Sequence, residues 1–517
     1  MAQLQTDTAY EPVMGLEVHA ELATESKMFC GCSTRFGAPP NSQTCPVCLG
    51  LPGSLPVINH KAVDYGLRAA LAVQCDIVSP CIFERKNYYY PDLPKNYQIS
   101  QKRAPLGRGG RLEIEVGGGA KSVGIDDVHL EEDTGKLLHP DATVRSGEAS
   151  SLRPLRPPKR DFVAREGGSA RGAGDDYSLV DYNRSGVPLL EIVGAPDLRS
   201  IEEVSAYMTA VRELLLYLGV SDCRMEEGKL RFEANISLRP AGAQEMGARV
   251  EIKNLNSFRT VLRCLEHELE RQEQVLRAGG EVARETRLWD EAACASAPMR
   301  SKEEAQDYRY FPEPDLVPLV IDEQWLQRSR KTLPELPNAR RRRFVEELGL
   351  SDYDAGILAG ERELADYFEA TVGAGIEPKA AANWVTGELL RHLNERGAPV
   401  GAPPVTPERL VELIKLVEQG AVTANAAKEV FAEMFTSGRA PQEIIAEHGL
   451  AQIQDQGELE GAVERVVAEN PGPVADFKAG RKQALGFLVG QVMKATRGRA
   501  DAQAVNELLL RHLAQAS

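Results

Sequence analysis

The spacing of four cysteines near the N-terminus is the strongest single constraint on how this chain folds. Cys30 and Cys32 are followed, after twelve intervening residues, by Cys45 and Cys48 in the run C-P-V-C-L-G. Thiolates are soft ligands, and two such pairs can close a tetrahedron around Zn²⁺. Four thiolates leave no coordination position open, so the spacing predicts a zinc site with a structural role. The alternative interpretation is four cysteines that lie near one another without a metal.

The other five of the nine cysteines are scattered along the 517-residue chain. In a reducing compartment, this distribution argues against a disulfide framework and for one metal site with incidental buried thiols. No apolar run reaches the roughly 18 residues that cross a bilayer, and the N-terminus lacks a signal-peptide pattern, so we expect a cytoplasmic protein without membrane contact. The formal charge of −15 argues against indiscriminate nucleic-acid binding but allows a local basic surface.

Strand and helix signals are mixed in the first part of the chain. Residues 112–116 and 231–238 alternate apolar and polar side chains, as half-buried strands do. Between them, residues 204–218 carry apolar side chains at helical spacing, and Gly219 marks the expected helix end. Ser257 is a candidate N-cap of another helix. These signals predict an antiparallel or mixed α+β domain.

The second part of the chain carries mainly helical signals. Strand patterns nearly vanish from about Glu323 onward, and residues 397–404 have the Gly- and Pro-rich composition of a stiff linker. Thr406 and Pro407 then have the pattern of a new helix start. The predicted domains are an α+β domain at 1–295, a helical domain at 296–400 and a helical tail domain at 406–517.

Acidic residues lie beside apolar, strand-like residues in three segments. In G-L-E-V-H-A-E, strand alternation places Glu17, His19 and Glu21 on one face, which is either a functional cluster or a solvated surface. H-L-E-E-D, at residues 129–133, carries three consecutive carboxylates. Glu191 stands alone in V-P-L-L-E-I-V and needs a partner or a metal if this segment is core. Oxygen ligands with one imidazole suit Mg²⁺ that holds the phosphates of a nucleotide.

Two further segments have unusual compositions. Residues 84–101, E-R-K-N-Y-Y-Y-P-D-L-P-K-N-Y-Q-I-S-Q, are either a tyrosine-rich surface loop or a binding loop for a flat anionic ligand such as a nucleotide. Residues 478–499 contain six basic and no acidic residues, which fits a solvated helix face or a contact with a phosphate backbone. The chain has no G-x-x-x-x-G-K-[ST] motif and no G-x-G-x-x-G motif that opens a helix, so a standard phosphate-binding loop is absent.

Six sequence blocks together resemble the B subunit of the glutamyl/aspartyl-tRNA amidotransferase family, in the family's order and over nearly the whole chain. The blocks are G-L-E-V-H-A-E-L at 15–22, the 84–101 segment, H-L-E-E-D-T-G-K at 129–136, L-V-D-Y-N-R-S-G-V-P-L-L-E-I-V at 179–193, R-S-K-E-E-A-Q-D-Y-R-Y-F-P-E-P-D at 300–315 and G-F-L-V-G-Q-V-M-K at 486–494. The Arg- and Pro-rich residues 151–176 are longer than the family pattern, and we interpret them as an exposed, disordered insertion.

The resemblance implies a component of an ATP-dependent enzyme built from three proteins. ATP phosphorylates the side-chain carboxylate of a tRNA misacylated with Glu or Asp, and ammonia attacks the acyl phosphate. An amidase partner, the A subunit, releases that ammonia from glutamine, and a small C subunit holds the two large ones together. The implied fold is a cradle of mostly antiparallel strands with helices, followed by an all-α domain and an all-α tail that grips the tRNA.

The resemblance also implies roles for individual residues. The expected Mg²⁺ ligands are Glu17, His19, Glu132 and Glu191, and the expected catalytic residues are Lys86, Glu131, Glu132 and Asp133. ATP binding is expected of Arg85, Lys86, Asn87, Asp92, Lys95 and Gln98. tRNA binding is expected of Lys478, Arg481, Lys482, Lys494, Arg497 and Arg499. The implied cofactors are ATP, Mg²⁺ and a structural Zn²⁺, since some family members hold zinc in a four-cysteine site.

Two alternatives from other functional classes stay open at this point. A non-catalytic tRNA-binding adaptor would use the zinc site and the basic tail but would need no carboxylate cluster. A free-standing ATP-dependent ligase of small carboxylic acids would not need residues 406–517. The choice between Glu-tRNA(Gln) and Asp-tRNA(Asn) as substrate depends on which misacylating synthetases share the cell.

Overall fold

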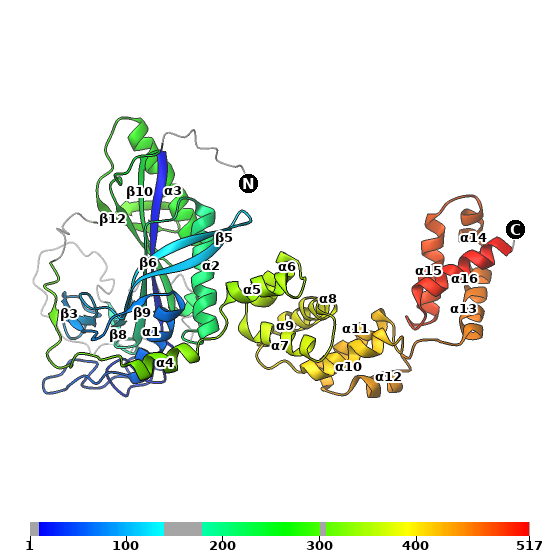
Figure 1. Cartoon of the computed structure of the whole chain (residues 1–517). Helices are drawn as coiled ribbons and strands as arrows, with labels where there is room; N and C mark the ends of the chain where they lie inside the picture. Colours follow the sequence, from blue (N-terminus) through cyan, green and yellow to red (C-terminus); the bar gives the residue numbers. More distant parts are fainter. Residues whose placement is uncertain (1–9, 139–177, 300–306, 516–517) are drawn as a thin grey trace, which may run out of the picture. The chain divides into compact units, whose positions relative to one another are not determined.

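The computed structural model describes residues 10–138, 178–299 and 307–515 (Figure 1). The chain divides into two compact units, Met1–Leu336 and Pro337–Ser517. The first unit mixes strands and helices, and the described part of the second unit is helical. The predicted α+β class is therefore confirmed. The insertion predicted at residues 151–176 lies outside the described residues.

Among the described residues, a nine-stranded sheet in the order β13-β12-β11-β10-β1-β9-β6-β5-β2 forms the centre of the first unit. Its strands are β1 Tyr10–Glu21, β2 Asp76–Ile77, β5 Gly107–Val116, β6 Gly119–Glu132, β9 Pro188–Gly194, β10 Leu230–Pro240, β11 Val250–Leu255, β12 Glu285–Asp290 and β13 Ala295–Pro298. Neighbouring strands of this sheet are antiparallel, except that β11 and β12 run parallel. The order makes β9 the neighbour of both β1 and β6.

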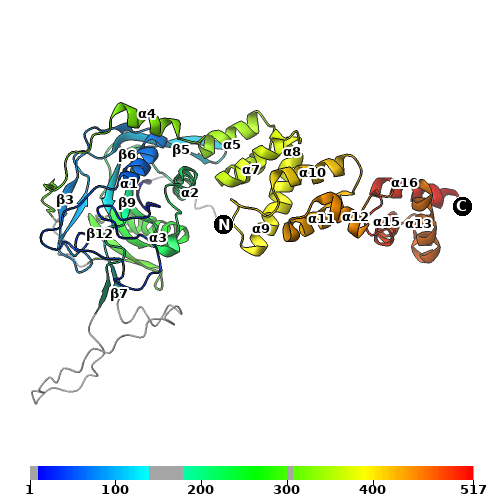
Figure 2. The ribbon, with the colours of Figure 1, turned by 90° about the horizontal axis from the view of Figure 1, so that it is seen from below.

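The two faces of the central strands differ in polarity. In β1, Leu16, Val18 and Ala20 are buried in the apolar core, and the residues between them point to the opposite face. The helices α1 His60–Ala72, α2 Ile201–Leu218 and α3 Phe258–Arg277 contribute to the same core and contact β6, β5 and β10 (Figures 1 and 2). The opposite face, which carries Glu17 and His19, is therefore available for a functional site.

The ends of α2 and α3 follow from capping residues. The side chain of Ser257 accepts a hydrogen bond from the backbone N–H of Thr260 at the start of α3. Gly219 ends α2 with φ of 63°, a left-handed conformation that glycine adopts without strain. Both predicted helix ends are thus confirmed.

Smaller elements complete the first unit. The described residues contain a three-stranded sheet, β14-β3-β4, and a two-stranded sheet, β7-β8. Their bounds are β3 Glu84–Asn87, β4 Tyr97–Ser100, β7 Lys136–Leu138, β8 Leu179–Asp181 and β14 Phe311–Pro312, with a 3₁₀ turn at Met225–Glu227 and the helix α4 at Glu323–Lys331. Because β14 pairs with β3 and α4 packs on α1, the first unit continues to Leu336, whereas the predicted boundary lies at residue 295.

The second unit contains two apolar clusters. Its helices are α5 Pro337–Glu346, α6 Asp352–Ala359, α7 Arg362–Gly373, α8 Pro378–Asn383, a π-helical segment Trp384–Leu389, α9 Leu390–Arg396, α10 Pro407–Glu418, α11 Ala424–Ser437, α12 Pro441–His448, α13 Gln456–Glu469, α14 Pro471–Lys478, α15 Gln483–Ala495 and α16 Ala502–Gln515. One cluster extends from Phe344 to Leu450 and the other from Ile453 to Leu513. The first cluster therefore includes both sides of the predicted linker at 397–404.

Thr406 caps α10 and Pro407 occupies its first turn, so the predicted helix start is confirmed. None of the helices within the described ranges combines the length and the apolar character needed to cross a lipid bilayer.

A buried hydroxyl in α2 allows a test of this packing. Among the described residues, the hydroxyl of Tyr207 has no hydrogen-bond partner although it is fully buried. Because an unsatisfied buried polar group destabilises the fold, Tyr207→Phe should raise the free energy of unfolding by about 1 kcal/mol. The matched variant Tyr367→Phe should lower it, because the Tyr367 hydroxyl donates to the Val405 carbonyl oxygen at 3.1 Å. Thermal unfolding measures both changes, and a destabilised Tyr207→Phe protein would contradict the prediction.

Candidate active site and metal sites

A row of ionisable side chains crosses the polar face of the central sheet. We call it the polar row, and its centre is formed by His19, Glu191 and His129. The strand register places Glu191 of β9 directly opposite His19 of β1 on one side and His129 of β6 on the other. The Glu191 Oε2 atom lies 3.3 Å from His19 Nε2 and 3.0 Å from His129 Nε2. The second ring nitrogen of His129, Nδ1, lies 2.7 Å from Asp127 Oδ1. The lone carboxylate predicted to need a partner is thus held between two imidazoles.

The charges in this row shift one another's pKa values. Burial by itself would lower the pKa of both imidazoles, but the adjacent Glu191 carboxylate raises the pKa of His19 to about 9 and that of His129 to about 10. Burial would raise the pKa of Glu191, yet the two imidazoles hold it well below its usual value. Glu191 is therefore an ionised carboxylate in a buried position, which is the state that a cation requires.

The row includes one group that could hold a metal ion. His19, Glu131 and Glu191 each offer a ligand atom, and these atoms lie within 4.8 Å of one another. Burial and the Glu191 charge raise the pKa of Glu131, because both disfavour its ionised form. Glu17 lies on the same face, two residues before His19 in β1, and Asn235 Nδ2 donates to its Oε1 at 3.0 Å. His19, Glu191 and Glu17 were predicted as ligands, and Glu131 was predicted as their neighbour.

Glu132 does not join this group, because alternation along β6 turns its side chain toward the other face. Its carboxylate accepts hydrogen bonds from the Lys95 ammonium and from the Ile99 backbone N–H, the latter at 2.9 Å. Its backbone carbonyl accepts from Gln98 Nε2 at 2.7 Å. Lys95 and Gln98, two residues predicted to bind ATP, are thus engaged with Glu132.

Asp133 lies at the end of the polar face and is 3% exposed. Its Oδ2 atom accepts from Arg231 at 2.9 Å and lies 3.6 Å from Arg184. Burial would raise the pKa of Asp133, but the two arginines hold it below its usual value. Sequence reasoning did not single out Arg231, Arg184 or His129. The only sequence signal for His129 was its place in the H-L-E-E-D block, since its partner Glu191 is 62 residues away in the sequence.

Lys86, on β3, lies within electrostatic reach of Glu131 and Glu191. Burial alone would lower its pKa, but the negative charge of Glu131 raises it. Its ammonium lies 5.2 Å from the ring centre of Tyr308 and 5.9 Å from that of Tyr88, within the range of cation–π contacts. Lys86 therefore places a positive charge near the carboxylates of the polar row.

The other predicted ATP-binding residues of this segment have partners within the protein. Arg85 makes two hydrogen bonds to Glu313, at 2.7 and 2.8 Å. Asn87 Nδ2 donates to the backbone carbonyls of Tyr308 and Arg309 at 3.1 and 3.0 Å. Burial raises the pKa of Asp92, and a hydrogen bond from the Thr134 side chain opposes this. Their predicted role in ATP binding stays a prediction.

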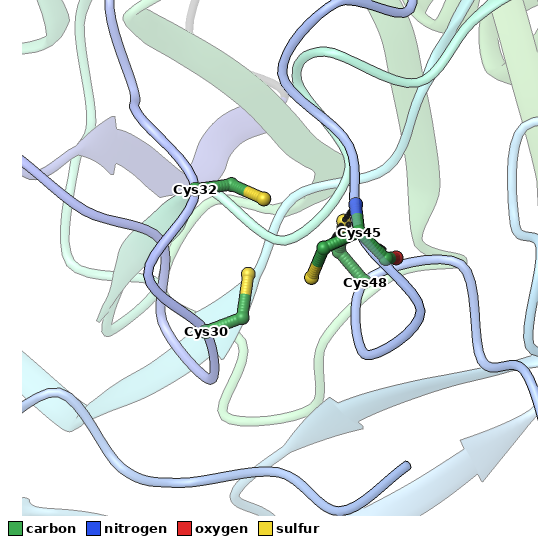
Figure 3. A group of neighbouring side chains, drawn as sticks. All are labelled: Cys30, Cys32, Cys45 and Cys48. Carbon is green, nitrogen blue, oxygen red and sulfur yellow. Dashed lines mark hydrogen bonds between the residues drawn. The ribbon is translucent and has the colours of Figure 1, made fainter.

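The four cysteines form a second group that could hold a metal ion. The Sγ atoms of Cys30, Cys32, Cys45 and Cys48 lie within 4.8 Å of one another. Figure 3 shows them converging from two loops, with one Cys-x-Cys pair facing the Cys-x-x-Cys pair. The Cys45 backbone N–H donates to Cys48 Sγ at 3.1 Å, which fixes the sulfur within the turn. This arrangement agrees with the metal site predicted from the spacing.

The six basic residues of the tail fall into two groups at the ends of α15. Lys478, Arg481 and Lys482 precede this helix, whereas Lys494, Arg497 and Arg499 lie at its end and beyond. Five of the six are exposed, and Arg499 is half-buried. Arg481 pairs with Asp476 at 3.0 Å, and Arg499 lies 3.5 Å from Glu458. The helix separates the two groups by roughly 20 Å at its rise of 1.5 Å per residue.

Comparison with known proteins decides the family. Residues 12–327 match the family model described as the GatB/GatE catalytic domain, and residues 366–513 match the one described as the GatB domain. The chain is 53% identical over 506 residues to a protein of Carboxydothermus hydrogenoformans, which covers 98% of this chain and 99% of that protein. Proteins of Moorella thermoacetica and Geobacter sulfurreducens are 52% and 49% identical over 504 residues, with 98% of this chain covered and 100% and 99% of theirs.

All three relatives are named as the B subunit of an aspartyl/glutamyl-tRNA(Asn/Gln) amidotransferase. The chain belongs to the family of amidotransferase B subunits. The resemblance in the sequence is thus confirmed. Within this amidotransferase chain, the polar row and the four cysteines fall inside the catalytic-domain match, and the tail's basic residues fall inside the second match.

The coupled row gives a pH-dependent prediction. Because the pKa values of His19 and His129 in the folded state lie above the usual value of about 6.5, their protonation stabilises the fold at low pH. This contribution is lost as the pH rises through about 9 and about 10. Glu191→Gln removes the carboxylate that raises both pKa values. We therefore expect the free energy of unfolding of the wild type to exceed that of Glu191→Gln most near neutral pH, and the difference to shrink in alkali. Unfolding with a metal chelator present measures this difference.

The surface variant Glu202→Gln, on α2, is the control for this measurement and should show no such trend. An advantage that stays constant from neutral to alkaline pH would mean that the imidazoles are not coupled to Glu191.

Proposed function

We propose that the chain is the B subunit of a cytoplasmic, ATP-dependent tRNA amidotransferase, a carbon–nitrogen ligase with glutamine as amido donor. It phosphorylates the side-chain carboxylate of Glu-tRNA(Gln), Asp-tRNA(Asn) or both, and amidates it to give Gln-tRNA(Gln) or Asn-tRNA(Asn). An amidase A subunit supplies the ammonia, and a small C subunit completes the enzyme. The observation that carries the proposal is the ionised Glu191 held between two imidazoles within the catalytic-domain match.

The polar row fits Mg²⁺ in its donor chemistry. Glu131 and Glu191 supply two carboxylates, and Glu17 lies on the same face. His19 supplies an imidazole once Mg²⁺ displaces the proton that Glu191 holds on its ring. Mg²⁺ bound there would neutralise charge on the phosphates of ATP. The proposal takes Glu131 as a ligand in place of the predicted Glu132, because the Glu132 carboxylate already accepts from Lys95 and Ile99.

The chain's own residues then neutralise and orient the reacting groups. A carboxylate is a poor electrophile, so its phosphorylation supplies the leaving group that ammonia displaces, and the step mainly requires charge neutralisation. The Lys86 ammonium faces this row and is placed to pair with the transferred phosphate. Asp133, fixed by Arg231, lies at the end of the row and is proposed to orient ammonia.

The four cysteines are proposed to hold a structural Zn²⁺, since four thiolates occupy a complete tetrahedral shell. The tail's basic residues are proposed to contact the tRNA backbone from both ends of α15. These assignments give the proposed Zn²⁺ and the proposed tRNA contact to residues outside the polar row, which takes Mg²⁺ and the phosphates of ATP.

The deciding experiment is co-expression with the two partner subunits and assay of each misacylated tRNA with ATP, Mg²⁺ and glutamine. The proposal expects tRNA-dependent ADP formation and amidated tRNA with at least one substrate. A non-catalytic adaptor would bind the tRNA without forming ADP, and a free-standing ligase would keep its activity after deletion of residues 406–517. Either outcome would contradict the proposal.

The metal assignment predicts which carboxylates matter for Mg²⁺. Glu131→Gln and Glu191→Gln should each raise the Mg²⁺ concentration needed for half-maximal ADP formation by about ten-fold or more, because each removes a charged ligand. Glu132→Gln should change this concentration much less, since its carboxylate faces Lys95. Mg²⁺ titration of the assembled enzyme measures the effect, with Glu202→Gln as the control. If Glu132→Gln raised the required Mg²⁺ concentration as much as Glu131→Gln and Glu191→Gln, Glu132 would have to be counted as a Mg²⁺ ligand.

The tail assignment predicts a change in salt dependence. Replacing Lys478, Arg481 and Lys482 together by Ala should weaken tRNA binding and flatten the slope of log affinity against log salt, by roughly 0.7–0.9 per lost phosphate contact. Lys379→Ala, a lysine elsewhere in the second unit, should leave the slope unchanged. Binding isotherms at several salt concentrations provide the test, and an unchanged slope in the triple variant would exclude these residues from the contact.

A further inference from the structure

Lys27 is a fully buried lysine whose role the proposed reaction does not explain. Its side chain has 0% exposure. The ammonium lies 3.7 Å from the Cys48 Sγ atom and donates to the Tyr182 carbonyl oxygen at 3.2 Å. Lysine is almost never fully buried unless its charge is paired, because desolvation of an ammonium is costly. The partner that can carry an opposite charge in this contact is the Cys48 sulfur.

The chemistry of a four-thiolate site supplies that charge. Zn²⁺ bound by four thiolates carries a formal charge of about −2, which is itself costly in a partly buried position. An ammonium that donates to one of the sulfurs compensates part of this charge and strengthens the contact. A buried lysine and a buried metal–thiolate centre therefore each lower the desolvation cost of the other.

The packing around Lys27 holds it in this position. Gly186, with φ of 87°, lies against both side chains: a Cβ there would be in ordinary van der Waals contact with Lys27 Cδ at 3.4 Å and with Cys48 Cβ at 3.5 Å. A cavity of about 60 Å³ lies beside Lys27, and Cys30, Cys48, Lys95 and Glu132 also line it. Lys95 pairs with Glu132 across this cavity, so the charge of Glu132 is already compensated and Lys27 is left for the thiolates.

We propose that Lys27 is the counter-cation of the four-cysteine site, a positioning residue that stabilises the metal-bound thiolates and ties them to the chain at Tyr182. This inference rests on the proposed zinc site. Through Tyr182 it also connects the metal to the segment that leads to Gly186, whose backbone N–H donates to the Asp133 carbonyl at 2.9 Å. The zinc loops are thereby attached to the end of the catalytic strand β6.

The test measures zinc retention by the full chain, independently of tRNA amidation. Lys27→Met removes the charge and keeps a side chain of similar length, so zinc transfer to a colorimetric chelator should be faster by about ten-fold or more. Lys27→Arg keeps the charge and should retain zinc better than Lys27→Met. Lys95→Met is the matched control, because Lys95 lines the same cavity but pairs with Glu132. It should release zinc at close to the wild-type rate.

Each outcome bears on a separate claim. Wild-type protein with less than about half an equivalent of zinc would overturn the proposed zinc site itself. Wild-type protein with a full equivalent, and Lys27→Met with an unchanged release rate, would overturn the role of Lys27 and leave the zinc site standing. Equal acceleration in Lys27→Met and Lys95→Met would also overturn it, because the effect would then be a general loosening of the cavity.

A second measurement covers the case in which Lys27→Met does not fold. The absorption of Co²⁺-loaded protein reports the sulfur donors directly, and Lys27→Gln is the milder replacement. The thiolate-to-metal band should shift between wild type and Lys27→Gln and should stay in place in Lys95→Met. An unshifted band in Lys27→Gln would contradict the proposed contact between the ammonium and the metal-bound sulfur.

Discussion

The buried carboxylate of Glu191 is the constraint on which the rest of the first unit depends. Its neighbours in β9, Leu190 and Ile192, are fully buried in the apolar core. A carboxylate in such a strand must be paired, and its two neighbouring strands supply His19 and His129 at the same level. A one-residue slip of either strand would move its imidazole to the other face, so this pairing also specifies the register of three central strands.

Other buried charges of the first unit are also paired with a neighbouring charge or polar centre. Glu132 is held by Lys95, Asp133 by Arg231, and Lys27 lies against the four-cysteine site. A site whose charges are fixed by neighbouring charges needs little reorganisation when a charged ligand arrives, which is what phosphoryl transfer requires. The segment that contacts the four cysteines is hydrogen-bonded to Asp133 at the end of β6, so the proposed structural metal and the proposed reaction centre share supporting residues.

In segment 84–101, the composition predicted the kind of partner that the side chains need but not which partner they have. Its basic and amide side chains suggested a nucleotide-binding loop, and the structure turns Lys86 alone among Arg85, Lys86 and Asn87 toward the polar row. Arg85 and Asn87 instead hold residues 308–313, more than 200 positions later in the chain. Composition indicates that such side chains need anionic or carbonyl partners, but it does not say whether those partners belong to a ligand or to the protein.

The sequence by itself determined the features that depend on near neighbours. The α+β class, the ends of α2 and α3, the start of α10 and the converging cysteine pairs could be predicted, because capping, alternation and ligand spacing act over a few residues. The family was predicted separately, from the resemblance of six sequence blocks. Only the tertiary structure decided which carboxylates meet. Alternation shows that Glu131 and Glu132 face opposite ways, but the order β1-β9-β6 decides that Glu131 joins His19 and Glu191, and that His129 becomes their partner. That order depends on pairing between strands far apart in the chain, which no local pattern encodes.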